Sequence, residues 1–275
     1  MKIPYLKAHG AKNDFLLTPA AEVPTGASPD DLARAICDRH TGVGADGWLH
    51  VGTGGTEADC EIRLFNSDGS IAEISGNGTR CAAAFLIYRG FAGQNIRVKT
   101  GAGIKHLRLL GREGLNFSFE MNMGTAEIRK KHFPMPLANG ARDVTLVWVG
   151  NPQCAVPVEN FDFDWRGMGA EIESHPQFPD RTNVSFFCVI DGHTIEVRFY
   201  ERGAGETLSS GTGSTGAAAA AISRGLVNVP VTVRTAAGPL ELRGSPDLYL
   251  VGPAAIIAEG VFHCEKIGRN EQFTS

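Results

Sequence analysis

Two stretches of the chain are almost purely apolar, and both are too short to cross a membrane. They run from Cys81 to Tyr88 and from Ala217 to Ile222. Each lies inside a longer segment that begins with serine and glycine and ends with arginine and glycine, 75–90 and 210–225. Serine is a preferred helix N-cap and glycine a common residue just after a helix end. The pattern therefore predicts one alanine-rich helix in each segment.

Short stretches of alternating apolar and polar residues surround both helices, and alternation of this kind indicates strands. The expected strands are 61–65, 95–100, 104–110, 115–121, 144–149, 196–200, 226–233, 240–242 and 249–261. Two further helices are expected, at 28–39 with Ser28 as its cap, and at 168–174. These are too few helices for a doubly wound parallel sheet. We expect an α+β fold in which mostly antiparallel sheets curl round the two alanine-rich helices.

The chain contains an internal duplication, because the second helical segment repeats the first 135 positions later without a gap. Ser75 aligns with Ser210 and Gly76 with Gly211, and the strand 61–65 aligns with 196–200. Repeats of this length indicate repeated structural units. The duplication predicts two pseudo-symmetric halves, with residues 1–121 and 262–275 forming the first, 122–261 forming the second, and the active site in the cleft between them.

The two helix starts are candidate anion sites. Free N–H groups and the helix dipole at an N-terminus favour a negative charge, and glycines allow close approach to the backbone. Two matched starts would form two half-sites for one carboxylate, with Ser75 and Ser210 beside it. The alternative is that both serines are ordinary caps and the glycines ordinary turn residues.

Composition narrows the range of functions. The chain has 275 residues and a net charge of −4, which gives no electrostatic basis for binding nucleic acid or an anionic membrane. Six scattered cysteines without a CxxC pair are typical of reduced thiols in the cytoplasm, and no histidine cluster has metal-ligand spacing. The segment 42–47, GVGADG, matches a dinucleotide motif by letters, but it follows a helix and precedes a strand, so a nucleotide site is not expected.

Several polar residues are expected just before or after strands, at the ends that face the two helix starts. They are Asn66, Asn151, Asn183, Glu201 and Arg202. Such a group suits an amino-acid ligand, and arginine can hold a carboxylate through two parallel hydrogen bonds. Each residue taken singly, like Asn13 near the N-terminus, is more typical of a turn or a surface ion pair than of a binding site.

A family resemblance rests on seven motifs that follow one another along nearly the whole chain. They are HGAKNDF, RHTGVGADG, FNSDGS, SGNGTRC, GNP, RTNV and ERGAGET followed by SGTG. Together they resemble the diaminopimelate epimerases. The resemblance implies a homodimeric, cofactor-independent enzyme that inverts the α-carbon of a diamino dicarboxylic acid by proton transfer between two opposed groups. It places the α-carboxylate at Gly76, Asn77, Gly211 and Thr212, and the distal end of the substrate at Asn13, Asn66, Asn151, Asn183 and Arg202.

The chain departs from the family pattern at the two acid/base positions. The family has cysteine at both, whereas this chain has Ser75 and Ser210, and Gln153 stands where the family usually has histidine. Cys81 and Glu201 are retained. A thiolate at a helix N-terminus can act as a base near pH 7, whereas a hydroxyl needs a neighbouring base. Serine at both positions should therefore impair the two-base epimerisation. The expected catalytic residues are Ser75 and Ser210, with help from Glu201.

Four interpretations remain open at this level. The chain is an epimerase of this family acting through its serines, an amino-acid-binding protein that has lost turnover, or a cysteine-to-serine variant that traps a complex. The fourth is an epimerase or dehydratase for another amino acid, such as a hydroxyproline, for which the distal contacts would be absent.

Overall fold

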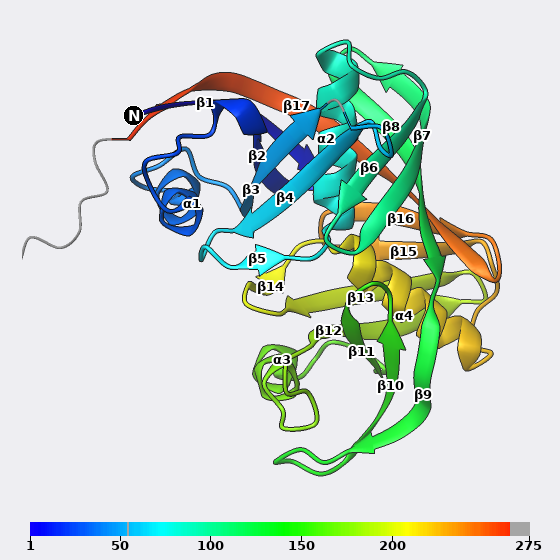
Figure 1. Cartoon of the computed structure of the whole chain (residues 1–275). Coiled ribbons are helices and arrows are strands. Elements are labelled where there is room, and N and C mark those ends of the chain that lie inside the picture. Colours follow the sequence, from blue (N-terminus) through cyan, green and yellow to red (C-terminus); the bar gives the residue numbers. More distant parts are fainter. Residues whose placement is uncertain (54, 265–275) are drawn as a thin grey trace, which may run out of the picture.

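The computed structural model describes residues 1–53 and 55–264, and within them the helices lie inside or against a large curved sheet (Figure 1). Two long helices occupy the interior of the two halves, and two shorter ones cover the outside. The α-helices are α1 (Pro29–Cys37), α2 (Gly76–Tyr88), α3 (Trp165–Glu173) and α4 (Gly211–Ser223), and a 3-10 turn, η1, spans Ala20–Glu22.

The described residues form seventeen strands that are connected into one sheet. They are β1 (Lys2–Gly10), β2 (Asn13–Pro19), β3 (Gly47–Thr53), β4 (Cys60–Asn66), β5 (Ile71–Ala72), β6 (Asn95–Thr100), β7 (Gly103–Glu113), β8 (Asn116–Thr125), β9 (Glu127–Met135), β10 (Arg142–Trp148), β11 (Pro152–Pro157), β12 (Asn183–Asp191), β13 (Thr194–Glu201), β14 (Gly205–Thr207), β15 (Val231–Thr235), β16 (Gly238–Arg243) and β17 (Asp247–His263). In this part of the chain only β2–β3, β4–β6, β11–β12 and β13–β15 pair in parallel. The predicted α+β class, with mostly antiparallel sheets, is confirmed.

The strand pairings repeat in the two halves, and each set of strands surrounds one helix. Around α2 the strands follow the order β17, β1, β2, β3, β4, β6, β7 and β8, and β8 pairs again with β17. Around α4 the strands β9 to β13 are followed by β15, β16 and β17. The pseudo-symmetry expected from the duplication therefore extends to the hydrogen-bonding pattern of the strands.

Two long strand segments connect the halves. The chain leaves the first half through β8 and enters the second as β9, which pairs with β10. In the opposite direction, β17 pairs with β16 over its first residues and with β1 over its last ones. The domain boundaries proposed from the sequence, after 121 and after 261, fall within β8 and β17.

The interior explains why the two central helices are apolar on all sides. The largest buried cluster contains the alanines of both α2 and α4 together with inward residues of the surrounding strands. A helix enclosed by a sheet has no solvent-facing side and therefore needs no polar stripe. Two smaller clusters lie beneath α1 and α3 on the outside of the halves.

Both central helices end in the same way. Gly90 and Gly225 have φ angles of +77° and +72°, a left-handed conformation that glycine adopts without strain. The N–H of Phe91 donates to the carbonyl of Leu86 (2.8 Å), and the N–H of Leu226 donates to that of Ala221 (3.0 Å). This is the Schellman arrangement, and it confirms the predicted helix ends.

The outer helices differ from the prediction in detail. Ser28 occupies the N-cap position of α1, but its hydroxyl contacts the Asp30 carboxylate and makes no capping hydrogen bond. Helix α3 starts at Trp165, earlier than expected, because Asp164 caps it by accepting from the N–H of Gly167 (2.9 Å). The acidic Asp30 competes for the Ser28 hydroxyl, which sequence spacing alone does not reveal.

Candidate active site

The N-termini of α2 and α4 face each other at the centre of the molecule. A methyl group on Gly76 would come within 3.1 Å of the Cα of Gly211, and one on Gly211 within 3.0 Å of the Cα of Gly76. Only glycine allows this approach. Among the described residues, the N–H groups of Gly76, Asn77, Gly211 and Thr212 have no protein acceptor. Two sets of free donors and two helix dipoles therefore meet at one place, as an anion site requires.

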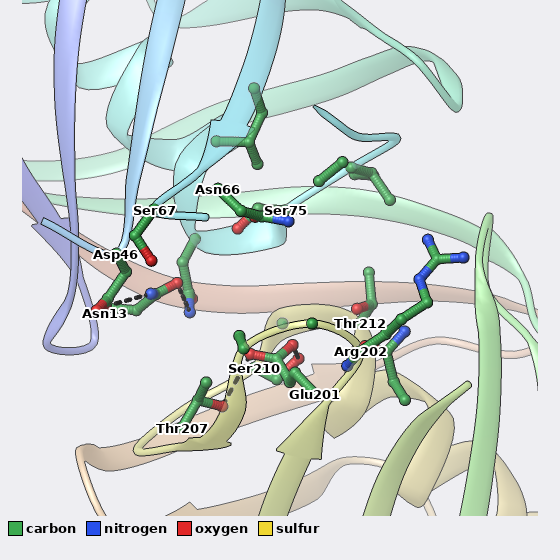
Figure 2. Close-up of a pocket in the computed structure, with 18 of the residues that line it drawn as sticks. Asn13, Asp46, Asn66, Ser67, Ser75, Glu201, Arg202, Thr207, Ser210 and Thr212 are labelled. Carbon is green, nitrogen blue, oxygen red and sulfur yellow. Dashed lines mark hydrogen bonds between the residues drawn. The ribbon is translucent and has the colours of Figure 1, made fainter. Parts of the chain in front are cut away.

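A cavity of about 520 Å³ opens in front of these helix starts (Figure 2). The structure brings every residue expected at the site into its lining. These residues are Asn13, Asn66, Ser75, Gly76, Asn77, Asn151, Asn183, Glu201, Arg202, Ser210, Gly211 and Thr212. They come from both halves of the chain, and a volume of this size is typical of a small-molecule site.

Ser210 has a carboxylate partner in the cavity wall. Its hydroxyl donates to Glu201 Oε1 at 2.6 Å, and Thr207 Oγ1 donates to Glu201 Oε2 at 2.8 Å (Figure 2). Burial raises the pKa of Glu201 above its usual value, and the two hydrogen bonds offset only part of this effect. A carboxylate with a raised pKa is a stronger base, so Glu201 is suited to accept a proton through Ser210.

Ser75 on the opposite wall has no such partner. Its hydroxyl accepts from the N–H of Gly78 (3.1 Å), just as Ser210 also accepts from the N–H of Gly213 (3.0 Å). Both serines are thus helix caps as well as cavity residues. The residue that the duplication aligns with Glu201 is Asn66, an amide that donates to Ser70 Oγ (2.9 Å). The two halves therefore share a backbone design but differ in proton-accepting capacity.

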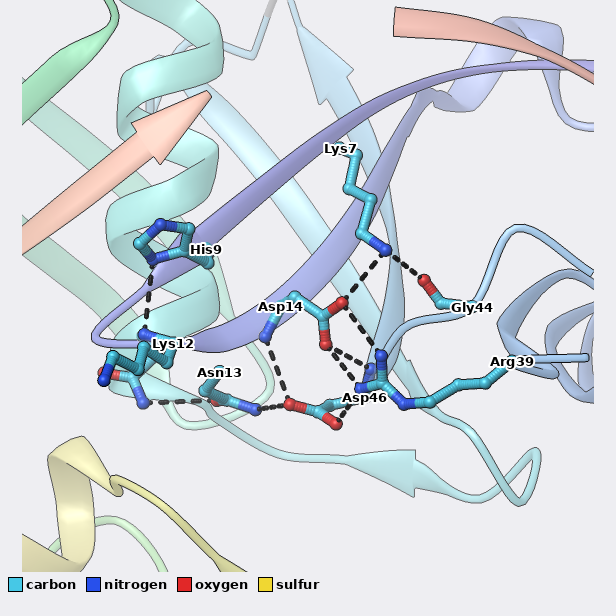
Figure 3. A network of polar contacts seen from close by, with 9 residues as sticks. Lys7, His9, Lys12, Asn13, Asp14, Arg39, Gly44 and Asp46 are labelled. Atoms are coloured by element: carbon cyan, nitrogen blue, oxygen red, sulfur yellow. Dashed lines mark hydrogen bonds and ion pairs between the residues drawn. The ribbon is translucent and has the colours of Figure 1, made fainter. Parts of the chain in front are cut away.

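A partly buried charge network holds Asn13 in place (Figure 3). The amide of Asn13 donates to Asp46 Oδ2 at 2.6 Å. Arg39 pairs with both Asp46 and Asp14 (each 2.7 Å), and Lys7 pairs with Asp14 (3.1 Å). Burial opposes the ionisation of Asp14, but the hydrogen bonds from Arg39 and Lys7 prevail and lower its pKa. The Asp46 carboxylate, held by Arg39, fixes which side of the Asn13 amide carries the N–H groups.

The chain of contacts continues from Asn13 to the start of α2. Asn77 Nδ2 donates to Asn13 Oδ1 and to the backbone carbonyl of Ser209 in the other half (both 3.2 Å). Arg80, which is fully buried, donates to Asn77 Oδ1 at 2.5 Å and to the carbonyl of Pro253 at 3.0 Å. Burial lowers the pKa of Arg80 to about 10, which still leaves it charged at pH 7. The oxygens of both amides are therefore engaged. The Asn13 amide keeps one N–H for an anionic ligand, whereas both N–H groups of the Asn77 amide are used within the protein.

On the second half, Gln153 orients another amide of the cavity. Gln153 Nε2 donates to Asn151 Oδ1 at 2.8 Å, and Asn151 Nδ2 lies 3.4 Å from Thr212 Oγ1. Gln153 itself is buried and its Oε1 has no partner among the described residues. Because an amide has no proton-accepting nitrogen, Gln153 positions Asn151 and cannot replace an imidazole base.

Asn183 and Arg202 occupy the outer part of the cavity. Asn183 Oδ1 accepts from the backbone N–H of Arg202 (3.1 Å), and its amide donates to the carbonyl of Pro152 (3.1 Å). The Arg202 side chain points toward the opposite half (Figure 2). There Arg202 Nη2 contacts Glu73 Oε2 at 2.5 Å. The arginine that was predicted to bind a ligand carboxylate is therefore paired with a carboxylate of the protein itself.

The cysteines offer no substitute for the two serines. Among the described residues Cys37, Cys60, Cys81, Cys154 and Cys188 are free, and Cys81, retained from the family motif, is buried inside α2. Burial raises the pKa of its thiol to about 12, so it stays protonated at neutral pH. None of the cysteines lines the cavity in the described part of the chain.

The described residues contain no group of three or more His, Cys, Asp or Glu side chains arranged to hold a metal ion. No helix in this region is long and apolar enough to cross a membrane.

Sequence reasoning missed several cavity residues. Asp46, Glu73, Thr207 and Arg39 line the cavity but were not among the expected site residues. Asp46 and Arg39 lie within the motif RHTGVGADG, and Glu73 precedes the N-cap Ser75 by two positions. Their proximity to these motifs could have identified them as site residues. Their contacts with Asn13, Arg202 and Glu201 depend on tertiary structure.

Comparison with known proteins agrees with the geometry. The family model described as "Diaminopimelate epimerase" matches residues 5–129 and 145–257. The diaminopimelate epimerase of Pelotomaculum thermopropionicum is 38% identical over 277 residues, covering 94% of this chain and 98% of the relative. That of Moorella thermoacetica is 37% identical with the same coverage.

Solved structures share the fold at low sequence identity. A hydroxyproline epimerase from Agrobacterium vitis with bound trans-4-hydroxy-L-proline superposes with a TM-score of 0.71 at 15% identity, covering 94% of this chain and 92% of that one. A probable proline racemase from Agrobacterium radiobacter gives 0.73 at 15%, with 99% and 94% coverage. Because the family model and relatives of this identity span most of the sequence, the chain belongs to the diaminopimelate epimerase family and is an isomerase of the epimerase type.

Proposed function

We propose that this chain converts LL-diaminopimelate to the meso isomer by moving the α-proton, without a cofactor. The family membership supports this substrate, and the cavity offers the chemistry that a diamino dicarboxylate needs. The observation that carries the proposal is the pair of facing helix starts with serines on opposite walls, one of them hydrogen-bonded to Glu201. With a ligand bound between the helix starts, this arrangement would provide a proton-transferring group on each side of the α-carbon.

The binding roles follow from the free donors in the cavity. The α-carboxylate would accept from the N–H groups at Gly76, Asn77, Gly211 and Thr212. The distal end would be held by amides and one guanidinium, which are Asn13, Asn66, Asn151, Asn183 and Arg202. Free backbone N–H groups at two helix N-termini favour an anion over a neutral group.

On the Ser210 face of the substrate, Glu201 is the final proton acceptor. The Cα–H bond breaks as its proton moves to Ser210 Oγ, while the hydroxyl proton of Ser210 moves to Glu201 Oε1. The carbanion then takes the proton of the Ser75 hydroxyl on the opposite face, Ser75 regains a proton from water, and Glu201 releases its own. Because Asn66 stands in place of a carboxylate near Ser75, we expect proton transfer at Ser75 to be the slower step.

A second candidate function is binding without turnover. The absence of a proton acceptor beside Ser75 in the described residues favours it, because a lone hydroxyl is a weak base. A site for a hydroxyproline-like ligand would not need Arg202 or the distal asparagines, and their presence in the cavity favours a longer dicarboxylate instead.

The test is isotope exchange in D2O with LL-diaminopimelate, followed by mass spectrometry and by chiral separation of the isomers. The wild type and a Ser75→Cys/Ser210→Cys variant are compared. Deuterium incorporation together with meso product in the wild type supports epimerisation by the serines. Turnover by the cysteine variant alone supports the binding protein. No exchange by either protein would contradict the assigned substrate.

We further propose that the chain acts as a homodimer in the cytoplasm, in the route to lysine and peptidoglycan precursors. This extends the family resemblance. Light scattering of the purified protein tests the dimer, and a monomer at micromolar concentration would contradict it.

A further inference from the structure

An ion pair between Glu73 and Arg202 bridges the two halves across the mouth of the cavity. Glu73 precedes α2 in the first half, and Arg202 follows β13 in the second. Glu73 Oε2 and Arg202 Nη2 are 2.5 Å apart, and both residues line the cavity. Arg202 Nη1 also donates to the carbonyl of Asp180 (3.3 Å), which keeps the guanidinium in place.

Each arginine that lines the cavity already has a carboxylate partner. Arg39 pairs with Asp14 and Asp46, and Arg181 pairs with the buried Glu173. The partners Asp14 and Glu173 are only 13% and 7% exposed, so neither can leave its arginine for solvent at low cost. Glu73, at 48% exposed, can rotate into water. A ligand carboxylate that binds an arginine of this cavity therefore most easily displaces Glu73.

Displacement leaves Glu73 half-exposed at the cavity wall and without its arginine partner. A ligand with a carboxylate alone at its distal end would place a second negative charge beside it. A ligand whose distal carbon carries both a carboxylate and an ammonium would replace both partners at once, with the carboxylate on Arg202 and the ammonium on Glu73. Such an exchange keeps every charge paired.

We infer that Glu73 is a specificity-determining residue that makes the distal site select a zwitterionic amino-acid end over a simple carboxylate. This inference rests on the proposed function, because it assumes that a dicarboxylic amino acid occupies the cavity. Four other carboxylates line the cavity, and all have partners. Asp46 pairs with Arg39, and Glu201 accepts from Ser210 and Thr207. Asp68 Oδ1 accepts from Ser70, and Glu206 pairs with Arg166.

The test is titration calorimetry of two ligands of equal chain length. LL-diaminopimelate carries the distal ammonium, and L-2-aminopimelate lacks it. The wild type and Glu73→Gln are compared, with Glu61→Gln as a matched control because Glu61 forms an exposed ion pair with Lys99 in the first half. We expect the wild type to prefer the diamino ligand by roughly tenfold or more, the effect of a single charge pair. In Glu73→Gln this preference should fall to within about twofold, mainly through tighter binding of L-2-aminopimelate.

The possible results separate the two proposals. Equal tightening of both ligands in Glu73→Gln would show that Glu73 only competes for Arg202, and equal weakening would show a structural role. Either result, or an unchanged preference, overturns this inference while leaving the proposed function standing. Failure of the wild type to bind either ligand overturns both. A loss of preference in the Glu61→Gln control would also contradict a specific role for Glu73.

Discussion

The Ser210 hydroxyl donates a 2.6 Å hydrogen bond to Glu201, and the duplicated half has no equivalent of this pair. The aligned positions in the first half hold Ser75 and Asn66, and the Asn66 amide bonds Ser70 instead. Among the described residues, the two halves therefore provide the same backbone donors, but only the second half bonds a carboxylate to its cavity serine. This asymmetry within a symmetric fold is the feature on which the chemistry of the site depends.

Replacing Glu201 with Gln should abolish α-proton exchange on the Ser210 face. The carboxamide keeps the size of the side chain but cannot accept the Ser210 proton, and general base catalysis typically contributes about 10²–10⁴-fold. Deuterium incorporation per unit time in D2O measures the effect. Thr207→Val is the comparison, since it removes one hydrogen bond to Glu201 and leaves the base present. Exchange at the wild-type rate in Glu201→Gln would exclude Glu201 as the base.

The pH dependence of exchange should show an acidic limb set by Glu201. Burial raises the pKa of this carboxyl, and only the ionised form accepts a proton, so the rate should fall as the pH decreases through that raised pKa. The midpoint should lie above 4.5, the ordinary value for glutamate. Rate measurements from pH 4 to 9 locate it. A midpoint at or below the ordinary value would contradict the burial effect.

The same residue should affect stability in a pH-dependent direction. Since the folded pKa of Glu201 is raised, the folded state binds the proton more tightly than the unfolded state, and this contribution is lost as pH rises through the folded pKa. Glu201→Gln has no such loss. The melting temperature of the variant relative to the wild type should therefore increase between pH 4 and pH 8, which calorimetric scans can measure. A constant difference would rule out the linkage.

Replacing Gly76 with Ala should separate the two helix starts. The added methyl would lie 3.1 Å from the Cα of Gly211, a backbone atom that cannot rotate away. Overpacking of this kind costs about 1–3 kcal/mol. Urea denaturation measures the free energy of unfolding, and ligand binding should weaken as well because the donors of both helices move. Gly93→Ala is the control, since a methyl there meets no atom within 4 Å. Equal stability of the two variants would contradict the close approach.

Removing the Asp46 carboxylate should loosen Asn13. In Asp46→Ala the Asn13 amide loses its 2.6 Å acceptor and can rotate its oxygen toward the cavity, where it would repel a carboxylate. A net loss of about 1.5 kcal/mol corresponds to roughly tenfold weaker binding. We expect KM to rise with a smaller change in kcat, because Asn13 does not transfer the proton. Asp59→Ala removes a comparable aspartate from an exposed ion pair with Arg97 and should leave KM unchanged.

Local sequence features were sufficient to identify the main components of the site. The offset repeat of Ser75–Gly76 at Ser210–Gly211 predicted two capped helices, and the hydrogen bonds to the N–H groups of Gly78 and Gly213 confirm both caps. Capping and helix ends depend on residues within one turn, so they can be derived from short motifs. The α+β class followed from alternating stretches around these two helices.

The pairing of side chains across the cavity could not be derived in this way. Glu73 and Arg202 are 129 positions apart, and Asn77 reaches the Ser209 carbonyl over 132 positions. The need for glycine at 76 and 211 likewise arises from each other's backbone, although ligand access was the reason the motif suggested. Short motifs are enough to establish which groups the site contains, because caps and strand ends are local properties. Which of these groups face each other depends on the folded chain, because contacts between the halves arise when distant segments close around the two helices.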